Sequence, residues 1–299
     1  MLGPVLETLI GGLMTGVLYA LVALGFVLIF KASGVFNFAQ GAMVLFAALS
    51  FARLSEFMPL VLAFALSVLI MIALAYAIEF LVLRRLVNQE GIILFMATLG
   101  IAYFLEGFGQ SIWGSDIYKI GLGLPTNPIF ILESVFPGGL LIDPVELIAA
   151  SICAVMVLVL AVFFQVTRIG RALRAVADDH QAAQSVGIPL NRIWIIVWAA
   201  SGLVALVAGM MWGAKLGVQF SLSLIALKAL PVLILGGLTS IPGAIVGGLI
   251  IGAGEKLAEV FWGPALGGAI EDWFAYMLAL AFLLVRPQGL FGERIIERV

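Results

Sequence analysis

Charged residues and histidine are scarce in this chain. Only 11% of its 299 residues are Asp, Glu, Lys or Arg, whereas a soluble chain has about 25%. The single histidine, His180, excludes a histidine-based metal site and a Ser-His-Asp triad. The formal net charge of -2 gives no support to a nucleic-acid partner. The chain therefore lacks the polar shell that a soluble enzyme or nucleic-acid binder presents to water.

Other chemical signatures are missing as well. The single cysteine, Cys153, cannot form an intrachain disulfide and lies in an apolar run, as a small buried side chain would. No G-x-x-x-x-G-K-[ST] motif is present, so we expect the chain not to hold ATP through a P-loop. Asp178-Asp179 stands without further carboxylates nearby. We therefore expect no catalytic activity, no metal and no cofactor bound by this chain.

Apolar residues make up 64% of the chain, more than a soluble fold of this size can bury, so the bilayer must be part of its solvent. No Lys or Arg precedes Lys31, so we expect the first apolar stretch to be a retained span rather than a cleaved signal. A spanning helix needs roughly 20 apolar residues. Nine segments qualify or nearly qualify: 5–30, 36–52, 58–83, 91–112, 144–166, 192–213, 222–238, 242–262 and 267–285.

The sequence thus predicts an all-α polytopic membrane protein with eight or nine transmembrane or re-entrant helices. The two shortest segments, 36–52 and 222–238, are interrupted or flanked by Gly, Asn, Gln or Pro. Such backbone is tolerated at membrane depth only where protein or a wet cavity satisfies it. We expect one transmembrane domain over 1–299, with a long excursion at 113–143 on one side of the membrane and an ordered loop at 167–191 on the other.

Basic residues are distributed unevenly between the loops. Ten of the 15 Lys and Arg residues fall on one side of the expected spans, which are Lys31, Arg84, Arg85, Arg168, Arg171, Arg174, Arg192, Arg286, Arg294 and Arg298. Because cytoplasmic loops are enriched in Lys and Arg, this side is expected to be cytoplasmic. The N-terminus is then outside and the C-terminus inside, which fits nine crossings.

Polar residues inside the spans are the default candidates for function. The residues expected on the substrate pathway are Asn37, Gln40, Glu106 and Lys228. Asn37 and Gln40 have an alternative role, because their amides can equally satisfy a helix break. Glu255 and Glu259 form a like-charge i,i+4 pair that Lys256 can offset.

Glycine and proline mark expected interruptions of the helices. The expected breaks are Gly34, Gly41, Pro231, Gly236, Gly237, Pro242 and Gly243. Other small residues recur four positions apart, as in Ala244-Gly248-Gly252 and Ser201-Ala205-Gly209. This spacing allows close packing of helices in lipid, and a sliding interface in a moving transporter is the other reading.

The inner loop predicts a short helix over 171–186 with a modest apolar stripe, which Gly187 and Pro189 end. The stripe comprises Leu173, Val176, Ala177, Ala183 and Val186. An isolated helix of this length is marginal in water. We therefore expect it to pack on a partner protein at the cytoplasmic face.

Three stretches together resemble the permeases of the branched-chain amino acid ABC importer family, the LivH-type subunit more than the LivM-type. The first is ALGFVLIF at 23–30 with GVFNFAQG at 34–41, where Gln40 replaces the family's frequent His. The second is GRALRA at 170–175 through Gly187-Ile188. The third is LGGLTSIPGA at 235–244 through Gly254-Glu255, with RPQGLFG at 286–292.

The resemblance implies a multi-pass subunit of the bacterial inner membrane with several partners. These are a second, LivM-like permease, two cytoplasmic ATPase subunits that hold ATP and Mg, and a periplasmic substrate-binding protein. The inner helix would dock on the ATPase, and the 113–143 excursion, with Glu133 and Asp143, would meet the binding protein. The residues implied for the coupling contact are Arg171, Ala172, Arg174, Ala175, Asp178, Ala182 and Gly187.

The substrate stays open at the level of sequence. The resemblance implies import of branched-chain or related amino acids, and relatives of this shape also carry urea, short amides or other small polar solutes. A self-sufficient secondary transporter is a further alternative, but no span carries the run of acidic residues that proton coupling would use. A membrane enzyme acting on lipids is another alternative, but this chain lacks the paired acids or histidines that such an enzyme would need.

Overall fold

The computed structural model describes residues 2–86, 89–123, 125, 127–133, 136, 139–178 and 180–292. The chain divides into two compact units, each described here by itself. Unit 1 comprises Met1–Ala23, Gly123–Val157 and Leu227–Val299, and unit 2 comprises Leu24–Leu122 and Leu158–Ala226. Helices α1, α5 and α9 each contribute residues to both units.

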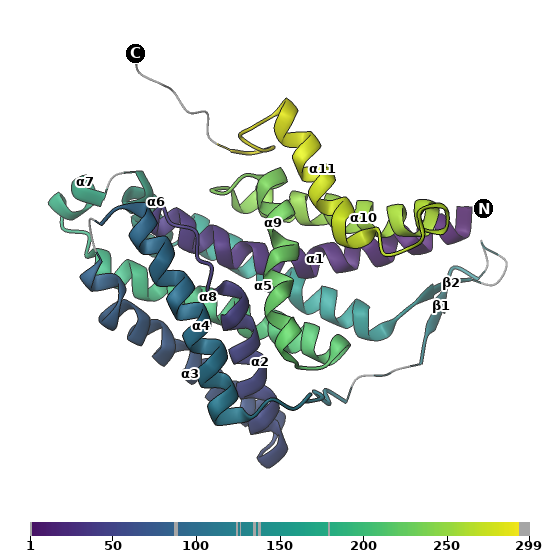
Figure 1. The fold of residues 1–299 in the computed structure, drawn as a ribbon, viewed down its shortest axis with the longest axis horizontal. Helices are drawn as coiled ribbons and strands as arrows, with labels where there is room; N and C mark the ends of the chain where they lie inside the picture. The colour runs from purple at the N-terminus through teal and green to yellow at the C-terminus, as the bar shows by residue number, and fades with distance from the viewer. Residues whose placement is uncertain are drawn as a thin grey trace. The chain divides into compact units, whose positions relative to one another are not determined.

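All nine apolar segments contain helix, which confirms the all-α prediction for them (Figure 1). They correspond to α1 (Leu2–Ser33), α2 (Gln40–Phe57), α3 (Leu60–Leu81), α4 (Gly91–Trp113), α5 (Pro144–Val166), α8 (Leu190–Leu216), α9 (Ile225–Gly236), α10 (Ile241–Leu266) and α11 (Glu271–Val285). Short 3-10 helices precede α4 and α9, as η1 (Leu83–Arg85) and η2 (Phe220–Leu224).

Five of these helices are long and apolar enough to cross a membrane: α1, α3, α4, α5 and α8. The stretch Phe220–Gly236 and α10 qualify together, but the chain bends by 114° between them. In α2, Arg53 and Glu56 lower the hydropathy, and α11 has only 15 residues. The structure therefore supports a multi-pass membrane protein with five or six helices that by themselves are suited to span.

The 113–143 excursion contains the only β-strands among the residues that the structure describes. Strands β1 (Ile129–Ile131) and β2 (Leu140–Ile142) pair antiparallel, with Phe130 opposite Leu141. Both strands are short runs of Ile, Leu and Phe, and Ile and Phe favour the pleated backbone. The all-α prediction missed this hairpin because the runs are too short to stand out from the apolar background.

Unit 2 is built around α2 and α8. Helix α2 packs against α3, α4 and α8, and α8 also packs against α3. Gly209 of α8 lies so close to α2 that a Cβ there would be 2.6 Å from the carbonyl oxygen of Val44. In α8, 72% of the apolar window is buried, against 28% in α3 and 22% in α4. Helix α8 is therefore interior, and α3 and α4 turn apolar faces outward, as lipid requires.

Unit 1 contains a close pairing of the first part of α1 with α10. A Cβ on Gly16 would lie 2.5 Å from the carbonyl oxygen of Gly248, and one on Gly252 would meet the carbonyl oxygen of Gly12. The opposite face of α10 packs on α9, where a Cβ on Gly247 would lie 2.6 Å from the carbonyl oxygen of Val232. The small-residue spacing thus serves helix packing on two faces of one helix.

The expected breaks fall partly where the sequence placed them. Helix α1 ends just before Gly34, and α9 ends at Gly236, where Gly237 takes the left-handed φ of 103° that glycine tolerates. Two expectations need correction. Pro231 lies inside α9, which continues past it, and Gly41 lies inside α2, where it packs against the carbonyl oxygen of Ser223.

The end of α9 is held by the start of α10 and by the C-terminal segment. Pro242 and Gly243 belong to the first turn of α10, and the Ser240 hydroxyl caps that turn by accepting from Gly243 N at 3.0 Å. The backbone amide of Leu290 donates to the carbonyl of Leu235 at 2.8 Å. The RPQGLFG segment therefore closes the bend after α9.

The inner loop forms two helices rather than the single one expected over 171–186. These are α6 (Arg168–Asp178) and α7 (His180–Ser185). The backbone amide of Ile188 donates to the carbonyl of Ala183, and Gly187 has a left-handed φ of 85°, which together end α7 in a Schellman motif. Within the expected stripe Leu173, Val176 and Ala183 are buried, but Val186 is exposed.

Candidate functional site

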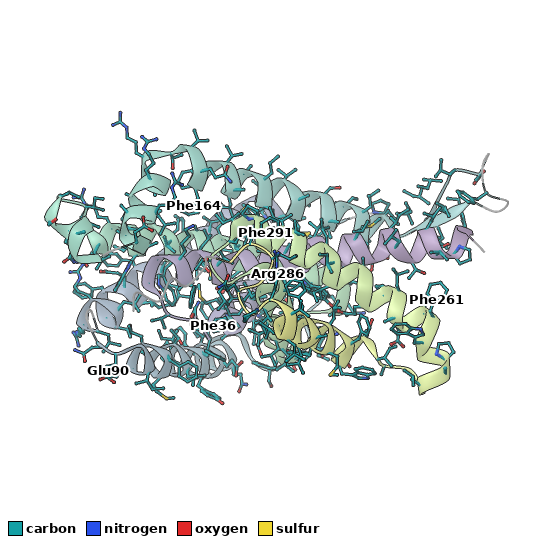
Figure 2. The ribbon with its side chains drawn as sticks, turned by 90° about the horizontal axis from the view of Figure 1, so that it is seen from above. Phe36, Glu90, Phe164, Phe261, Arg286 and Phe291 are labelled. Atoms are coloured by element: carbon teal, nitrogen blue, oxygen red, sulfur yellow. The ribbon has the colours of Figure 1, made fainter. Side chains whose placement is uncertain are left out.

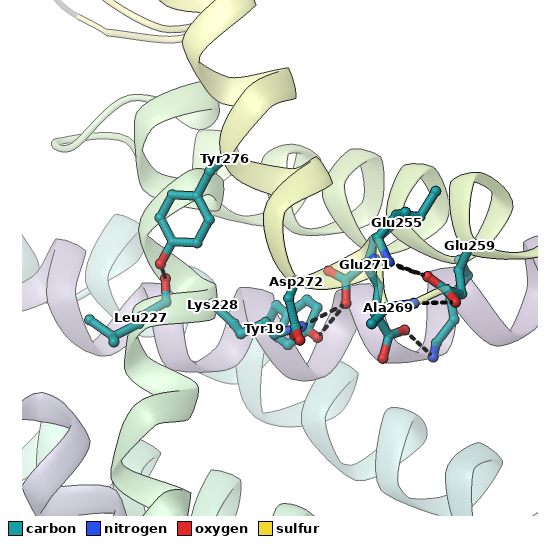
Figure 3. A network of polar contacts seen from close by, with 11 residues as sticks. Tyr19, Leu227, Lys228, Glu255, Glu259, Ala269, Glu271, Asp272 and Tyr276 are labelled. Carbon is teal, nitrogen blue, oxygen red and sulfur yellow. Dashed lines mark hydrogen bonds and ion pairs between the residues drawn. The ribbon is translucent and has the colours of Figure 1, made fainter. Parts of the chain in front are cut away.

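A network of charged and phenolic side chains lies in unit 1 (Figure 3). Lys228 Nζ of α9 is 2.8 Å from Asp272 Oδ1 of α11 and 3.3 Å from Glu255 Oε1 of α10. The Tyr19 hydroxyl of α1 donates to the same Glu255 oxygen at 3.1 Å. Helices α1, α9 and α10 therefore meet at the carboxylate of Glu255, a residue that is 1% exposed, and α11 joins them through Lys228.

The second oxygen of this carboxylate is not satisfied in the same way. Glu255 Oε2 is buried and has no hydrogen-bond partner among the residues that the structure describes. The side chain of Lys228 is 25% exposed and that of Asp272 is 72% exposed. The network thus runs from an exposed carboxylate through a partly exposed ammonium group to a buried carboxylate.

Neighbouring charges on α10 hold the start of α11. Lys256 Nζ pairs with Glu271 Oε2 at 2.8 Å. The Glu259 carboxylate accepts from the backbone amides of Ala269, Ile270 and Glu271, at 3.0, 2.7 and 3.0 Å. Carboxylates at a helix N-terminus are favourable because they satisfy its free amides. Each charge of the expected Glu255–Glu259 pair therefore has its own partner, and Lys256 serves Glu271.

The sequence draws attention to Lys228 and to Glu255 separately, but it does not predict that they pair. Asp272 and Tyr19 were not singled out, since neither spacing nor pattern connects α1, α9, α10 and α11. A lysine inside an expected span carries one usable signal, namely that it requires an opposite charge from elsewhere in the chain.

Asn37 and Gln40 lie together in unit 2, fully buried at the start of α2. Asn37 Oδ1 accepts from the backbone amide of Ala39 at 3.1 Å, and Asn37 Nδ2 donates to Gln40 Oε1 at 3.4 Å. Gln40 Oε1 also accepts from the Ser201 hydroxyl of α8 at 2.7 Å. These contacts bond the amides of Asn37 and Gln40 within the α1–α2 break and connect it to α8.

Phenylalanine rings surround the same break. Phe26 stacks on Phe36 with ring centroids 4.7 Å apart, and Phe38 meets Phe95 edge to face at 4.7 Å. The Thr98 hydroxyl accepts from the backbone amide of Phe38 at 3.3 Å. The non-helical turn is thereby held by α4 as well as by α8.

Glu106, the fourth pathway candidate, lies on α4 and is half-buried. It makes no hydrogen bond or ion pair with any residue of the described ranges. The structure does not bring it together with Asn37 and Gln40 through any contact, although all three belong to unit 2.

The implied coupling segment begins directly at the end of α5. Arg174 donates to the carbonyl oxygens of Phe164 and Gln165 at 2.7 and 3.3 Å, and Arg171 donates to that of Val166 at 3.2 Å. Basic side chains at a helix C-terminus satisfy its free carbonyls and oppose its dipole. Both arginines therefore fasten α6 to α5.

The remaining residues of that segment differ in exposure. Gly170 packs without a side chain against the carbonyl of Phe164, which lies where α5 meets α6 (Figure 2). Ala172 and Ala175 are half-buried. Asp178, Ala182 and Gly187 are exposed. Helix α6 thus buries Leu173 and Val176 against its own chain and presents a short polar ridge outward.

An open cavity of about 280 Å³ lies in unit 1 between the first turns of α1, the start of α5 and α10. Its charged lining residues are Glu7, Asp143, Glu146 and Lys256. Asp143 Oδ1 also accepts from the backbone amide of Val145 at 2.8 Å, which caps α5. Glu133, the other residue expected to meet a binding protein, is exposed in the turn after β1. In the described part of the chain, His, Cys, Asp and Glu nowhere gather in a group of three able to hold a metal.

Comparison with known proteins gives a consistent result over almost the whole chain. The family model described as the permease component of the branched-chain amino acid transport system matches residues 8–286. The high-affinity branched-chain amino acid transport system permease protein BraD of Pseudomonas aeruginosa is 30% identical, covering 98% of both chains.

Two further relatives have similar coverage. The high-affinity branched-chain amino acid transport system permease protein LivH of Escherichia coli is 29% identical over 98% of this chain and 97% of its own. The probable branched-chain amino acid transport permease protein LivH of Methanocaldococcus jannaschii is 28% identical over 94% and 91%.

Proposed function

This chain belongs to the permease component family of branched-chain amino acid transport systems, and from that premise we propose that it imports branched-chain amino acids as one subunit of an ABC transporter. The match over residues 8–286 carries the proposal. The apolar outward faces of α3 and α4 agree with it, because they fit a chain that works within the bilayer.

The proposed topology has nine crossings, with the N-terminus outside and the C-terminus in the cytoplasm of the inner membrane. The asymmetry of Lys and Arg supports this orientation. If the bent pair of α9 and α10 is instead one broken span, eight crossings remain and the two termini lie on the same side. A reporter active only outside, fused after residue 125 and after residue 290, distinguishes the two: activity at 125 alone agrees with nine crossings.

The proposed energy source is a pair of cytoplasmic ATPase subunits that contact α6 and α7. The attachment of α6 to α5 by Arg171 and Arg174 supports this. Their side chains bond carbonyl oxygens at the end of α5, so a displacement of α6 is passed on to α5. The exposed residues Asp178 of α6, Ala182 of α7 and Gly187 after α7 would contact the ATPase. A second permease of LivM type and a periplasmic binding protein complete the proposed complex.

Ala175→Asp tests the coupling contact. Ala175 is half-buried on α6, so a carboxylate there obstructs close approach of a partner while the spans stay intact. We expect weaker co-purification of the ATPase with unchanged membrane insertion, whereas Gln89→Asp, an exposed position outside α6, leaves both unchanged. Unaltered assembly and transport in Ala175→Asp would show that the contact lies elsewhere.

Among the pathway candidates, Lys228 has the surroundings best suited to a zwitterion. Its ammonium group stands beside two carboxylates, so the cluster offers both signs of charge to an amino acid. Asn37, Gln40 and Glu106 are proposed to shape the pathway from unit 2, Asn37 and Gln40 by fixing the backbone break.

Reconstitution in liposomes tests the function as a whole. Uptake of labelled leucine is expected only when this permease, its partner permease, the ATPase subunits, ATP and the binding protein are all present. Uptake by this chain alone would identify a self-sufficient transporter. Uptake of urea or acetamide in preference to leucine by the full complex would overturn the proposed substrate class.

A further inference from the structure

An apolar groove of about 320 Å³ lies in unit 2 between α3 and α4. Leu74, Ile78 and Val82 line it from α3, and Ala97, Gly100 and Phe104 line it from α4. Its lining contains no charged residue. Leu74 and Val82, the residue at the C-cap of α3, are eight positions apart, which gives the groove a length of about 12 Å at the rise of an α-helix.

An arginine pair stands directly beyond one end of this groove. Leu81 and Val82 belong to the groove, and Arg84 and Arg85 follow in the η1 turn. Arg84 is already engaged: its guanidinium bonds both oxygens of Glu79 at 3.3 Å and lies 5.2 Å from the centroid of the Phe80 ring. Its charge is therefore largely neutralised within α3 and η1.

Arg85 is different, because its side chain is exposed and makes no hydrogen bond or ion pair within the described ranges. Glu90, at the N-cap of α4, is the acidic residue that follows it, and it too is exposed, with no bond to Arg85. A guanidinium that no described residue engages thus follows Val82, the last lining residue of the groove on this segment, by three positions. Guanidinium binds phosphate oxygens in a two-pronged geometry that an ammonium group does not match.

We propose that this groove is a binding site for one anionic phospholipid, with an acyl chain between α3 and α4 and the phosphate on Arg85. Apolar lining and a cation at one end match the two chemical parts of such a lipid. Basic positions between transmembrane helices recognise anionic headgroups. The site would stabilise the outward-facing surface of α3 and α4, which contact each other little and pack mainly on α2 and α8.

The lipid is distinguished from a protein occupant by charge. A helix of a second permease would cover the apolar lining equally well but would give Arg85 no phosphate. The groove ends at Val82, where α3 also ends and the arginine pair of η1 follows, which fits a lipid with its headgroup at that end.

Two pairs of variants test the site in the purified transporter complex. Arg85→Gln removes the headgroup contact, and Arg192→Gln is its control at another exposed arginine. Gly100→Leu fills the groove, because a Cβ there meets nothing within 4 Å, and Gly107→Leu is its control on the same helix with equally open surroundings. None of the four changes meets a packed core.

The measurement is native mass spectrometry after incubation with phosphatidylglycerol or phosphatidylcholine. We expect the unaltered complex to retain phosphatidylglycerol preferentially. Arg85→Gln should weaken that retention about fivefold, the effect of one basic residue at an anionic surface. Gly100→Leu should reduce retention of both lipids, and both controls should match the unaltered complex. Equal retention of the two lipids, or test variants that behave like their controls, would refute the site.

A photoreactive acyl chain on phosphatidylglycerol provides an independent measurement. Cross-linked peptides from residues 74–82 and 97–105 of the assembled complex would support the lipid. If the lipid cross-links other peptides of the assembled complex and none from these two ranges, the proposal is wrong.

Discussion

Lys228 and Glu255 are 27 positions apart in the sequence, yet Nζ and Oε1 lie 3.3 Å apart between α9 and α10. The carboxylate is buried, and the ammonium group is its one cationic partner among the residues that the structure describes. Removal of one member of a buried ion pair leaves an uncompensated charge, whereas removal of both can cost little.

We therefore predict that Lys228→Met lowers the free energy of unfolding by about 3–5 kcal/mol. The Lys228→Met/Glu255→Gln double variant should recover much of that loss. Arg53→Gln, which breaks an exposed pair with Glu56, should change it by less than about 1 kcal/mol. Thermal and denaturant unfolding in detergent micelles measures all three. Additive effects of the two network substitutions would show that the residues are not coupled.

The packing of α1 on α10 leaves no room for side chains at its glycines. A Cβ at Gly252 meets the carbonyl oxygen of Gly12, so Gly252→Ala should destabilise the protein by about 1–3 kcal/mol through overpacking. Gly11→Ala is the matched control, because a Cβ there meets nothing within 4 Å. That control should be neutral or slightly stabilising, since alanine favours helix. Equal melting temperatures for the two variants would contradict the close approach.

Ser201 connects the α1–α2 break to α8. Its hydroxyl lies 2.7 Å from Gln40 Oε1 and 3.2 Å from the carbonyl oxygen of Gly25. Ser201→Ala removes the hydroxyl from a fully buried cluster, and the expected loss of stability is about 1–3 kcal/mol. Ser111→Ala, where an exposed hydroxyl bonds only the carbonyl of Gly107 on its own helix, should have little effect. The same unfolding assay compares the two serines. An unchanged free energy of unfolding in Ser201→Ala would show that this cluster does not stabilise the fold.

Arg174 is predicted to transmit motion between α6 and α5. Arg174→Ala loses the bonds to Phe164 and Gln165, so ATP hydrolysis in the full complex should respond several-fold less to loaded binding protein while the ATPase stays bound. Arg174→Lys should restore part of the response, because an ammonium group can still donate to one carbonyl. Arg168→Ala, at an exposed arginine, is the control. Loss of ATPase binding in Arg174→Ala would assign the residue to the contact surface instead.

The sequence alone determined the solvent, the class and most helix positions. A 64% apolar composition cannot be reconciled with water on all sides, and apolar runs of about 20 residues specify helices because backbone groups in lipid must bond within their own segment. The sequence also predicts the helix ends at Gly187 and Gly237, since glycine readily adopts the positive φ angles found there. The predicted helix break at Pro231 is wrong, because surrounding helices can stabilise a helix across a proline that an isolated helix would not tolerate.

Only the tertiary structure decided which helices meet and which polar groups pair. Small residues at four-residue spacing indicate that a helix packs closely but do not specify which helix it packs against. Only the structure shows that α10 packs against α1 on one face and against α9 on another. The Tyr19–Glu255–Lys228–Asp272 network joins four helices that no local pattern relates. In a membrane protein every helix is apolar on most of its surface, so hydropathy predicts that helices pack without indicating their partners.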